Sequence, residues 1–173
     1  DDQSASQRLS LESGGLAYYV ACLREVFEES GLLLALTESG EYLKLNDAAT
    51  RERFSEHRRA LNAREITFRD IIAQEKLRLD LTALEYYSHW VTPIGPPRRF
   101  DTRFFVALAP EHQEAAHDAG ETVADTWITP SDALERVRRR ELDMIFPTIK
   151  NLEGIAHLHS AADVLNFARE LTN

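Results

Sequence analysis

The chain has 173 residues, of which 43% are hydrophobic and 28% are charged, and its formal net charge is −9. This composition suits one globular fold with a sizeable core, and the acidic charge argues against a nucleic-acid partner held by an overall positive surface. No apolar run approaches the roughly 18 residues that cross a bilayer, so we expect no membrane partner. Cys22 is the only cysteine, which excludes an internal disulfide framework and predicts a reducing, cytoplasmic location.

The first half of the chain predicts a loop, a helix and a short buried strand. Residues 1–15, DDQSASQRLSLESGG, are polar and predict a loop. A helix is predicted over Leu16–Ser30, because at about 100° per residue its apolar side chains fall on one side. Its charged side chains fall on the other side: Arg24, Glu25, Glu28 and Glu29. Gly31 suits the left-handed residue that ends a helix, and Leu32–Leu36 predicts a buried strand.

Two further helices are predicted before the middle of the chain. Asn46–Leu61 is rich in charge and alanine and predicts an exposed helix, with Asn46 or Asp47 as its cap. Thr67 followed by Asp70 is typical of a helix start, and this helix is expected to run to about Glu75.

The next segment predicts strands. Glu85–Pro93 contains aromatic and β-branched residues and predicts a strand. Ile94–Arg99 must be a loop, because its two adjacent prolines cannot lie inside a ladder. Asp101–Ala109 is largely apolar and predicts a central strand. Pro110–Gly120 predicts a polar loop, and Glu121–Thr129 a third strand.

Helices are predicted again towards the C-terminus. Pro130-Ser131 opens a helix near Asp132–Arg140, and Pro147 suits the first turn of another. Ser160 with Asp163 predicts the cap of a last helix that ends near Leu171. Strands mixed with helices in this order predict an α/β or α+β fold, with helices covering a mixed sheet.

The charged face of the first predicted helix has two interpretations. A solvated face of arginine and glutamate is typical of surface helices. However, Glu25 repels Glu28 and Glu29 at spacings of three and four residues, and all three acids lie near the C-terminal end, where the helix dipole disfavours negative charge. Mg²⁺ or Mn²⁺, which prefer oxygen ligands, would relieve this repulsion.

The order of residues in this helix resembles a known motif. REVFEESGL, Arg24–Leu32, follows R-E-U-x-E-E-x-G-U, where U is aliphatic, which is the conserved half of the Nudix box. The chain therefore resembles the Nudix hydrolases. The resemblance implies an α/β/α sandwich with a mixed sheet and hydrolysis of a nucleoside diphosphate linked to another moiety. It implies Glu25, Glu28 and Glu29 as ligands of Mg²⁺ or Mn²⁺, with Arg24 orienting the glutamates.

The upstream half of the box departs from the family pattern. The glycine and glutamate that normally precede the arginine fall here on Ser10 and Leu16. The strands that normally precede the box are not found either. We therefore expect an interrupted box within a single Nudix domain over residues 1–173 that lacks part of its N-terminal region.

Four longer stretches are similar to the coenzyme A diphosphatase subgroup of the family: GGLAYYVACLREVFEESGLLLA, YYSHWVTPIGPPRRFDTRFFVALAP, ETVADTWITPSDAL and FPTIKNL. An interrupted box is typical of that subgroup, and residues 46–75 would be its helical insertion. The resemblance implies hydrolysis of coenzyme A or acyl-CoA to 3′,5′-ADP and a phosphopantetheine.

Two alternatives stay open: a hydrolase of ADP-ribose or a dinucleotide, and a Nudix-like module that binds a nucleotide without cleaving it. Three intact glutamates count against the module, which needs no complete metal cluster. In each case the expected partner is a small-molecule nucleotide conjugate, and a homodimer is a further expectation.

Three further residues outside the box are candidates for the site. Glu121 precedes the WITPSDAL segment, where Nudix hydrolases often place a metal ligand or the base for water; the alternative is a solvated glutamate at a strand start. Arg99 and Arg103 suit bidentate binding of a phosphate, whereas pairing with Asp101 is the simpler interpretation.

Aromatic and histidine side chains give two more candidates. Tyr86, Tyr87 and Trp90 could stack on adenine, although core packing is favoured. His157 and His159 lack a cysteine or acidic partner at ligand spacing and are predicted to be surface residues.

Overall fold

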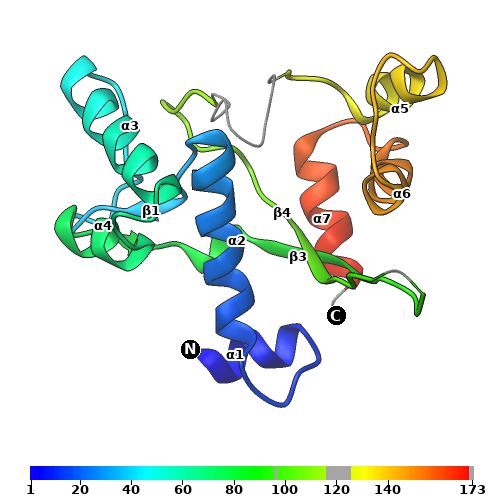
Figure 1. Ribbon diagram of the computed structural model, residues 1–173, viewed down its shortest axis with the longest axis horizontal. Coiled ribbons are helices and arrows are strands. Elements are labelled where there is room, and N and C mark those ends of the chain that lie inside the picture. The colour runs from blue at the N-terminus through cyan, green and yellow to red at the C-terminus, as the bar shows by residue number, and fades with distance from the viewer. Residues whose placement is uncertain (96, 116–125, 172–173) are drawn as a thin grey trace. The chain divides into compact units, whose positions relative to one another are not determined.

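The computed structural model describes residues 1–95, 97–115 and 126–171. These residues form two compact units (Figure 1). The first unit comprises residues 1–84 with the described part of 108–125, and the second comprises residues 85–107 with the described part of 126–173. Each unit is described by itself.

The first unit contains four helices over its described residues: α1 Asp2–Arg8, α2 Gly15–Ser30, α3 Ala48–Asn62 and α4 Phe68–Gln74. Asp47 is the N-cap of helix α3, and its side chain accepts a hydrogen bond from the Thr50 N–H at 2.8 Å. Helix α4 begins with a reciprocal capping box between Thr67 and Asp70. The three helices predicted in this half are therefore confirmed.

The prediction of a loop over the first residues is wrong, because α1 occupies Asp2–Arg8. The Asp1 carboxylate caps this helix by accepting from the Ser4 N–H at 2.8 Å. Ala5 and Leu9, at a spacing of four residues, are 8% and 4% exposed. Two apolar side chains are too few for a helical period to be read from the sequence.

The core of the first unit gathers around Phe27 of α2. Its ring meets the edge of Phe54 in α3 at a centroid distance of 6.5 Å and lies 6.3 Å from Phe68 in α4. Leu23 and Ile71 are fully buried beside them. Each residue supplies the buried side of its own helix, so the predicted apolar faces form one core.

The predicted strand over Leu32–Leu36 is only partly correct. Strand β1 covers Ala35–Leu36 and pairs antiparallel with β2, Arg78–Leu79, after which a 3₁₀ turn spans Leu81–Ala83. Leu33 is fully buried but lies outside the strand. Its N–H donates to the side-chain carbonyl oxygen of Gln113 at 2.9 Å, so a side chain takes the place of a neighbouring strand.

The second unit contains an antiparallel hairpin of β3, Glu85–Val91, and β4, Asp101–Val106. Both strands were predicted, but β4 was expected to be central. Over the described residues, β4 pairs with β3 alone. Of the predicted third strand, Thr126–Thr129 is not a strand, and residues 121–125 lie outside the described residues.

Three helices complete the second unit: α5 Pro130–Arg138, α6 Phe146–Ile155 and α7 Ala161–Leu171. Pro130 and Pro147 lie in first turns, as predicted, and the Asp163 N–H donates to the Ser160 hydroxyl at 3.1 Å. Helix α7 lies alongside β3 (Figure 1). No helix in the described part of the chain is long and apolar enough to cross a membrane.

Asn151 of α6 joins its helix to β3. Its side-chain oxygen accepts hydrogen bonds from the Ser88 hydroxyl at 2.8 Å and from the Trp90 indole N–H at 3.0 Å. Its backbone oxygen accepts from the Tyr87 hydroxyl at 2.9 Å. The strand that carries YYSHW is thereby fixed to the helix that carries FPTIKNL.

Candidate active site

Helix α2 separates its residues into two faces as the sequence predicts. Tyr19, Leu23 and Phe27 are at most 2% exposed and face the core of the first unit. The charged residues point away from that core and are half-buried or exposed: Arg24, Glu25, Glu28 and Glu29.

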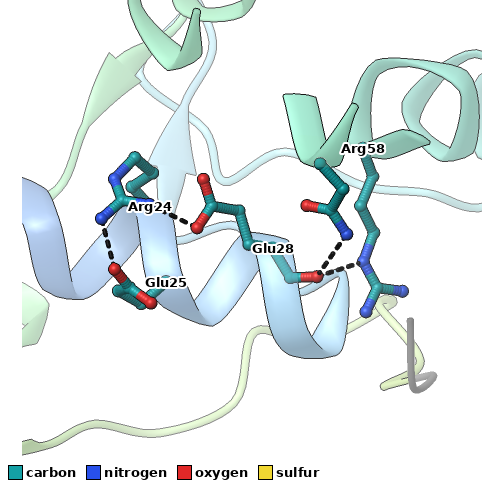
Figure 2. A network of polar contacts seen from close by, with 5 residues as sticks. Arg24, Glu25, Glu28 and Arg58 are labelled. Atoms are coloured by element: carbon teal, nitrogen blue, oxygen red, sulfur yellow. Dashed lines mark hydrogen bonds and ion pairs between the residues drawn. The ribbon is translucent and has the colours of Figure 1, made fainter. Parts of the chain in front are cut away.

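Arg24 joins two of the three glutamates. Its guanidinium donates to the Glu25 carboxylate and to the Glu28 carboxylate, and so lies between them (Figure 2). The Glu25 side chain is 53% exposed and the Glu28 side chain 22%. Burial opposes the charge of Arg24, but the hydrogen bonds to Glu28 and Glu25 outweigh it and raise the pKa of the guanidinium. Arg24 therefore stays charged and relieves the repulsion between the carboxylates.

The fit of this face to a divalent cation is partial. Three carboxylates within two turns of one helix supply the hard oxygen donors that Mg²⁺ and Mn²⁺ prefer. However, across residues 1–95, 97–115 and 126–171 no three histidine, cysteine or acidic side chains come close enough together to hold a metal ion. The donor chemistry fits such an ion, and a full set of ligands would need oxygens beyond those that the described residues bring together here.

The start of α2 is capped from α1. Gly14, the N-cap residue, offers no side chain. Instead, the Asp2 carboxylate accepts from the Gly14 N–H and the Leu16 N–H, each at 2.9 Å, and the Ser6 hydroxyl accepts from the Gly15 N–H at 2.8 Å. These backbone hydrogen bonds hold the pKa of Asp2 below its usual value. A helix start needs such acceptors for its free N–H groups, and here another helix supplies them.

The end of α2 is held from α3. Gly31 ends the helix with φ of +75°, as predicted, and its N–H donates to the Phe27 oxygen at 3.0 Å. Arg58 donates from Nε to the Glu28 backbone oxygen at 2.9 Å (Figure 2). It also donates from a terminal nitrogen to the Glu29 backbone oxygen. Both ends of the helix that carries the glutamates are thus fixed by other helices.

Comparison with known proteins identifies the family. The family described as NUDT19 Nudix domain matches residues 2–155 of the chain. The chain belongs to this Nudix family.

Relatives and a solved structure agree with this assignment. Over 157 residues the Nudix chain is 27% identical to "Acyl-coenzyme A diphosphatase NUDT19" of Xenopus laevis, covering 86% of this chain and 41% of that protein. It is 29% identical over 165 residues to the Homo sapiens protein of the same name, covering 88% and 42%. The chain therefore spans less than half the length of these curated relatives.

The fold is shared with a solved Nudix structure. The crystal structure of a NUDIX hydrolase from Alicyclobacillus acidocaldarius superposes with a TM-score of 0.74 at 27% identity, covering 86% of this chain and 64% of that one. The predicted α/β Nudix fold is thereby confirmed.

The remaining predicted site residues do not belong to α2. Glu121 lies outside the described residues. Arg99 donates from Nε to the Thr92 backbone oxygen at 2.9 Å. Arg103 donates to Asp101 at 3.1 Å, and its side chain is only 6% exposed. The simpler interpretation, pairing with Asp101, describes Arg103 in this structure.

The aromatic side chains of β3 pack within the second unit. Tyr86 lies 5.9 Å from Phe105 between ring centroids, and Trp90 meets the edge of Phe146 at 5.7 Å. These contacts agree with core packing. His157 is exposed and packs edge-on against a phenylalanine of α7, as a surface histidine does.

Residues that fix the glutamate helix were missed by the sequence reasoning. Asp2, Ser6 and Arg58 bind α2 across separations of up to 30 residues. The sequence patterns that predict helix ends involve residues within one turn of each other. They therefore do not reveal caps that another helix supplies. The last turn of α2 has no basic residue, and this is the one sequence feature from which a cation supplied by another helix could have been expected.

Proposed function

We propose that the chain hydrolyses the diphosphate linkage of a nucleoside diphosphate conjugate, with Mg²⁺ or Mn²⁺ held by Glu25, Glu28 and Glu29. One observation carries the proposal: Arg24 and its two carboxylates form an ordered network on the Nudix box helix. The network supports the proposal because Arg24 fixes the directions of two carboxylates on the helix that carries all three candidate ligands.

The residues divide the chemistry between them. A divalent cation held by these residues would lower the pKa of water and neutralise phosphate charge, the chemistry that hydrolysis near neutral pH requires. Glu25, Glu28 and Glu29 would hold the cation, and Arg24 orients Glu25 and Glu28. A carboxylate accepts the proton of the attacking water, and Glu121 is our candidate for this base.

Coenzyme A or acyl-CoA is the proposed substrate. Support comes from the name shared by the relatives, "Acyl-coenzyme A diphosphatase", and from the match to their Nudix domain over residues 2–155. Water would cleave the P–O–P linkage and release 3′,5′-ADP and the corresponding phosphopantetheine. The homodimer and the cytoplasmic location stay predictions.

A substrate panel tests the proposal. Coenzyme A, acyl-CoA, ADP-ribose and a dinucleotide are each incubated with the chain and Mg²⁺ or Mn²⁺, and the products are separated by chromatography. We expect release of 3′,5′-ADP from coenzyme A at a higher kcat/KM than that of ADP-ribose cleavage. Omission of the metal ion should abolish the reaction.

The alternatives correspond to distinct results. Preferred cleavage of ADP-ribose or the dinucleotide would contradict the coenzyme A assignment while keeping the diphosphatase. Tight binding of a nucleotide without cleavage of any diphosphate would identify a binding module instead.

A further inference from the structure

The last two backbone oxygens of α2 before Ser30 belong to the two adjacent glutamates of the box, and α3 binds both. Arg58 Nε donates to the Glu28 oxygen at 2.9 Å, and Asn62 donates to the same oxygen at 3.3 Å. Arg58 also donates from a terminal nitrogen to the Glu29 oxygen. Arg58 and Asn62 lie four residues apart on α3, so they share one face of that helix.

The contact is electrostatic as well as geometric. The C-terminal end of a helix carries roughly half a negative charge, and the last turn of α2 has no basic residue of its own. Glu28 and Glu29 add two carboxylates to this turn. The charge of Arg58 therefore offsets a concentration of negative charge that would otherwise favour fraying of the turn.

Gly31 relieves crowding at this contact. A Cβ built at this position would lie 3.3 Å from the Arg58 terminal nitrogen and 3.7 Å from Cζ. The residue that ends the box helix thus also leaves room for the guanidinium against its last turn. From the sequence alone, Gly31 is predicted to end the helix, but its proximity to Arg58 is not.

We infer that Arg58 is a positioning residue for the box glutamates: it fixes the last turn of α2, and with it the directions of the Glu28 and Glu29 side chains. The inference rests on the proposed role of these glutamates as metal ligands. In these contacts Arg58 acts through the backbone oxygens of Glu28 and Glu29. Its loss should weaken metal binding in a protein that stays folded.

The test compares Arg58→Ala with Arg59→Ala. Arg59 is the next residue on α3, its side chain is 67% exposed, and it pairs with Glu52 within the same helix. The affinity for Mn²⁺ is measured by electron paramagnetic resonance, without substrate, at a temperature where circular dichroism shows every variant folded. We expect Arg58→Ala to bind Mn²⁺ about 10-fold more weakly and Arg59→Ala to match the wild type.

Arg58→Lys provides a second measurement, including when Arg58→Ala does not fold. Lysine keeps the charge but cannot bind both oxygens with a fixed fork, so we expect a smaller but measurable loss of Mn²⁺ affinity. Wild-type affinity in every folded Arg58 variant would overturn the inference, as would an equal loss in Arg59→Ala.

Failure of the proposed function gives a different pattern. If coenzyme A is not hydrolysed but the 10-fold difference in Mn²⁺ affinity is observed, the substrate assignment fails and the role of Arg58 stands. If Glu28→Gln loses Mn²⁺ and Arg58→Ala keeps it, only the role of Arg58 fails. Absence of Mn²⁺ binding by the wild type overturns both.

Discussion

The Gly15 N–H donates to the Ser6 hydroxyl at 2.8 Å, and the two residues lie so close that no side chain fits at position 15. A Cβ there would lie 2.3 Å from the Ser6 backbone nitrogen and 2.4 Å from its Cα. Both obstacles are backbone atoms, which cannot turn away as a flexible side chain does. The start of the Nudix box helix therefore packs directly against the backbone of α1.

Gly15→Ala should destabilise the protein by about 3 kcal/mol, because α1 must move and the caps from Ser6 and Asp2 are strained or lost. Gly14→Ala is the matched control. A Cβ at Gly14 meets nothing within 4 Å, so only its left-handed backbone, φ +81°, is penalised. We expect about 1 kcal/mol there. Urea unfolding measures the free energy of unfolding of both variants. Equal losses of stability would contradict the close packing of α2 against α1.

The sequence predicted those elements whose signals lie within a single turn. Asp47, the Thr67–Asp70 pair and Ser160 each cap the helix that directly follows them, and the structure has each cap in place. Gly31 ends α2 in the predicted left-handed conformation. These predictions need only a side chain and a backbone group a few residues apart.

What could not be predicted depends on distant partners. The apolar run over Leu32–Leu36 predicts a full strand, but Gln113, 80 residues away, binds Leu33 through its side chain. The caps of α2 by Asp2 and Arg58 have the same character. In the candidate site, the motif named the glutamates, but only the structure reveals what fixes their helix.

Replacement of a single box glutamate tests the metal assignment. Glu28→Gln and Glu29→Gln should each lower kcat/KM on the order of 100-fold, because glutamine keeps the shape of the glutamate side chain but removes the charge that would bind the metal ion. The fold should survive, since an ion pair such as that of Glu28 with Arg24 contributes only about 0.3–0.5 kcal/mol. Glu65→Gln, an exposed glutamate between α3 and α4, is the control. Full activity in both box variants would mean that the metal assignment is wrong.

Gly154 and Tyr87 should be energetically coupled. A Cβ at Gly154 would lie 2.3 Å from the Tyr87 hydroxyl oxygen but 3.6 Å from its Cζ, an ordinary contact distance. Gly154→Ala alone should therefore cost about 2 kcal/mol, and Tyr87→Phe about 1 kcal/mol, through loss of its hydrogen bond to the Asn151 oxygen.

The double variant Gly154→Ala/Tyr87→Phe distinguishes a clash with the Tyr87 hydroxyl from any other cost of alanine at this position in α6. Without the hydroxyl, alanine fits at position 154 and favours the helix by up to about 1 kcal/mol relative to glycine. Urea unfolding of the four proteins should thus give the double variant a stability close to that of Tyr87→Phe. Additive losses would show that the hydroxyl is not the obstacle.

The Cys22 thiol should be unreactive in the folded protein at pH 8. Burial raises the pKa of Cys22 to about 11, with the charge of Glu25 as a second cause. Only about one Cys22 side chain in a thousand is then the reactive thiolate at pH 8. An unfolded cysteine, whose pKa is near 8.5, has a far larger thiolate fraction at the same pH. Iodoacetamide labelling followed by mass spectrometry should be slow in buffer and fast in urea. Equal rates in both would contradict the burial of this side chain.

The same pKa gives the sign of a stability change with pH. Between about pH 8.5 and 11 the unfolded chain releases the Cys22 proton while the folded chain keeps it, so the unfolded state binds fewer protons. The stability that the neutral thiol contributes is therefore complete below about pH 8.5 and is lost as the pH rises towards 11. Cys22→Ala lacks this contribution, so the wild type should lose stability relative to the variant between pH 8 and pH 10 in urea unfolding. A difference that stays constant over this range would contradict the raised pKa.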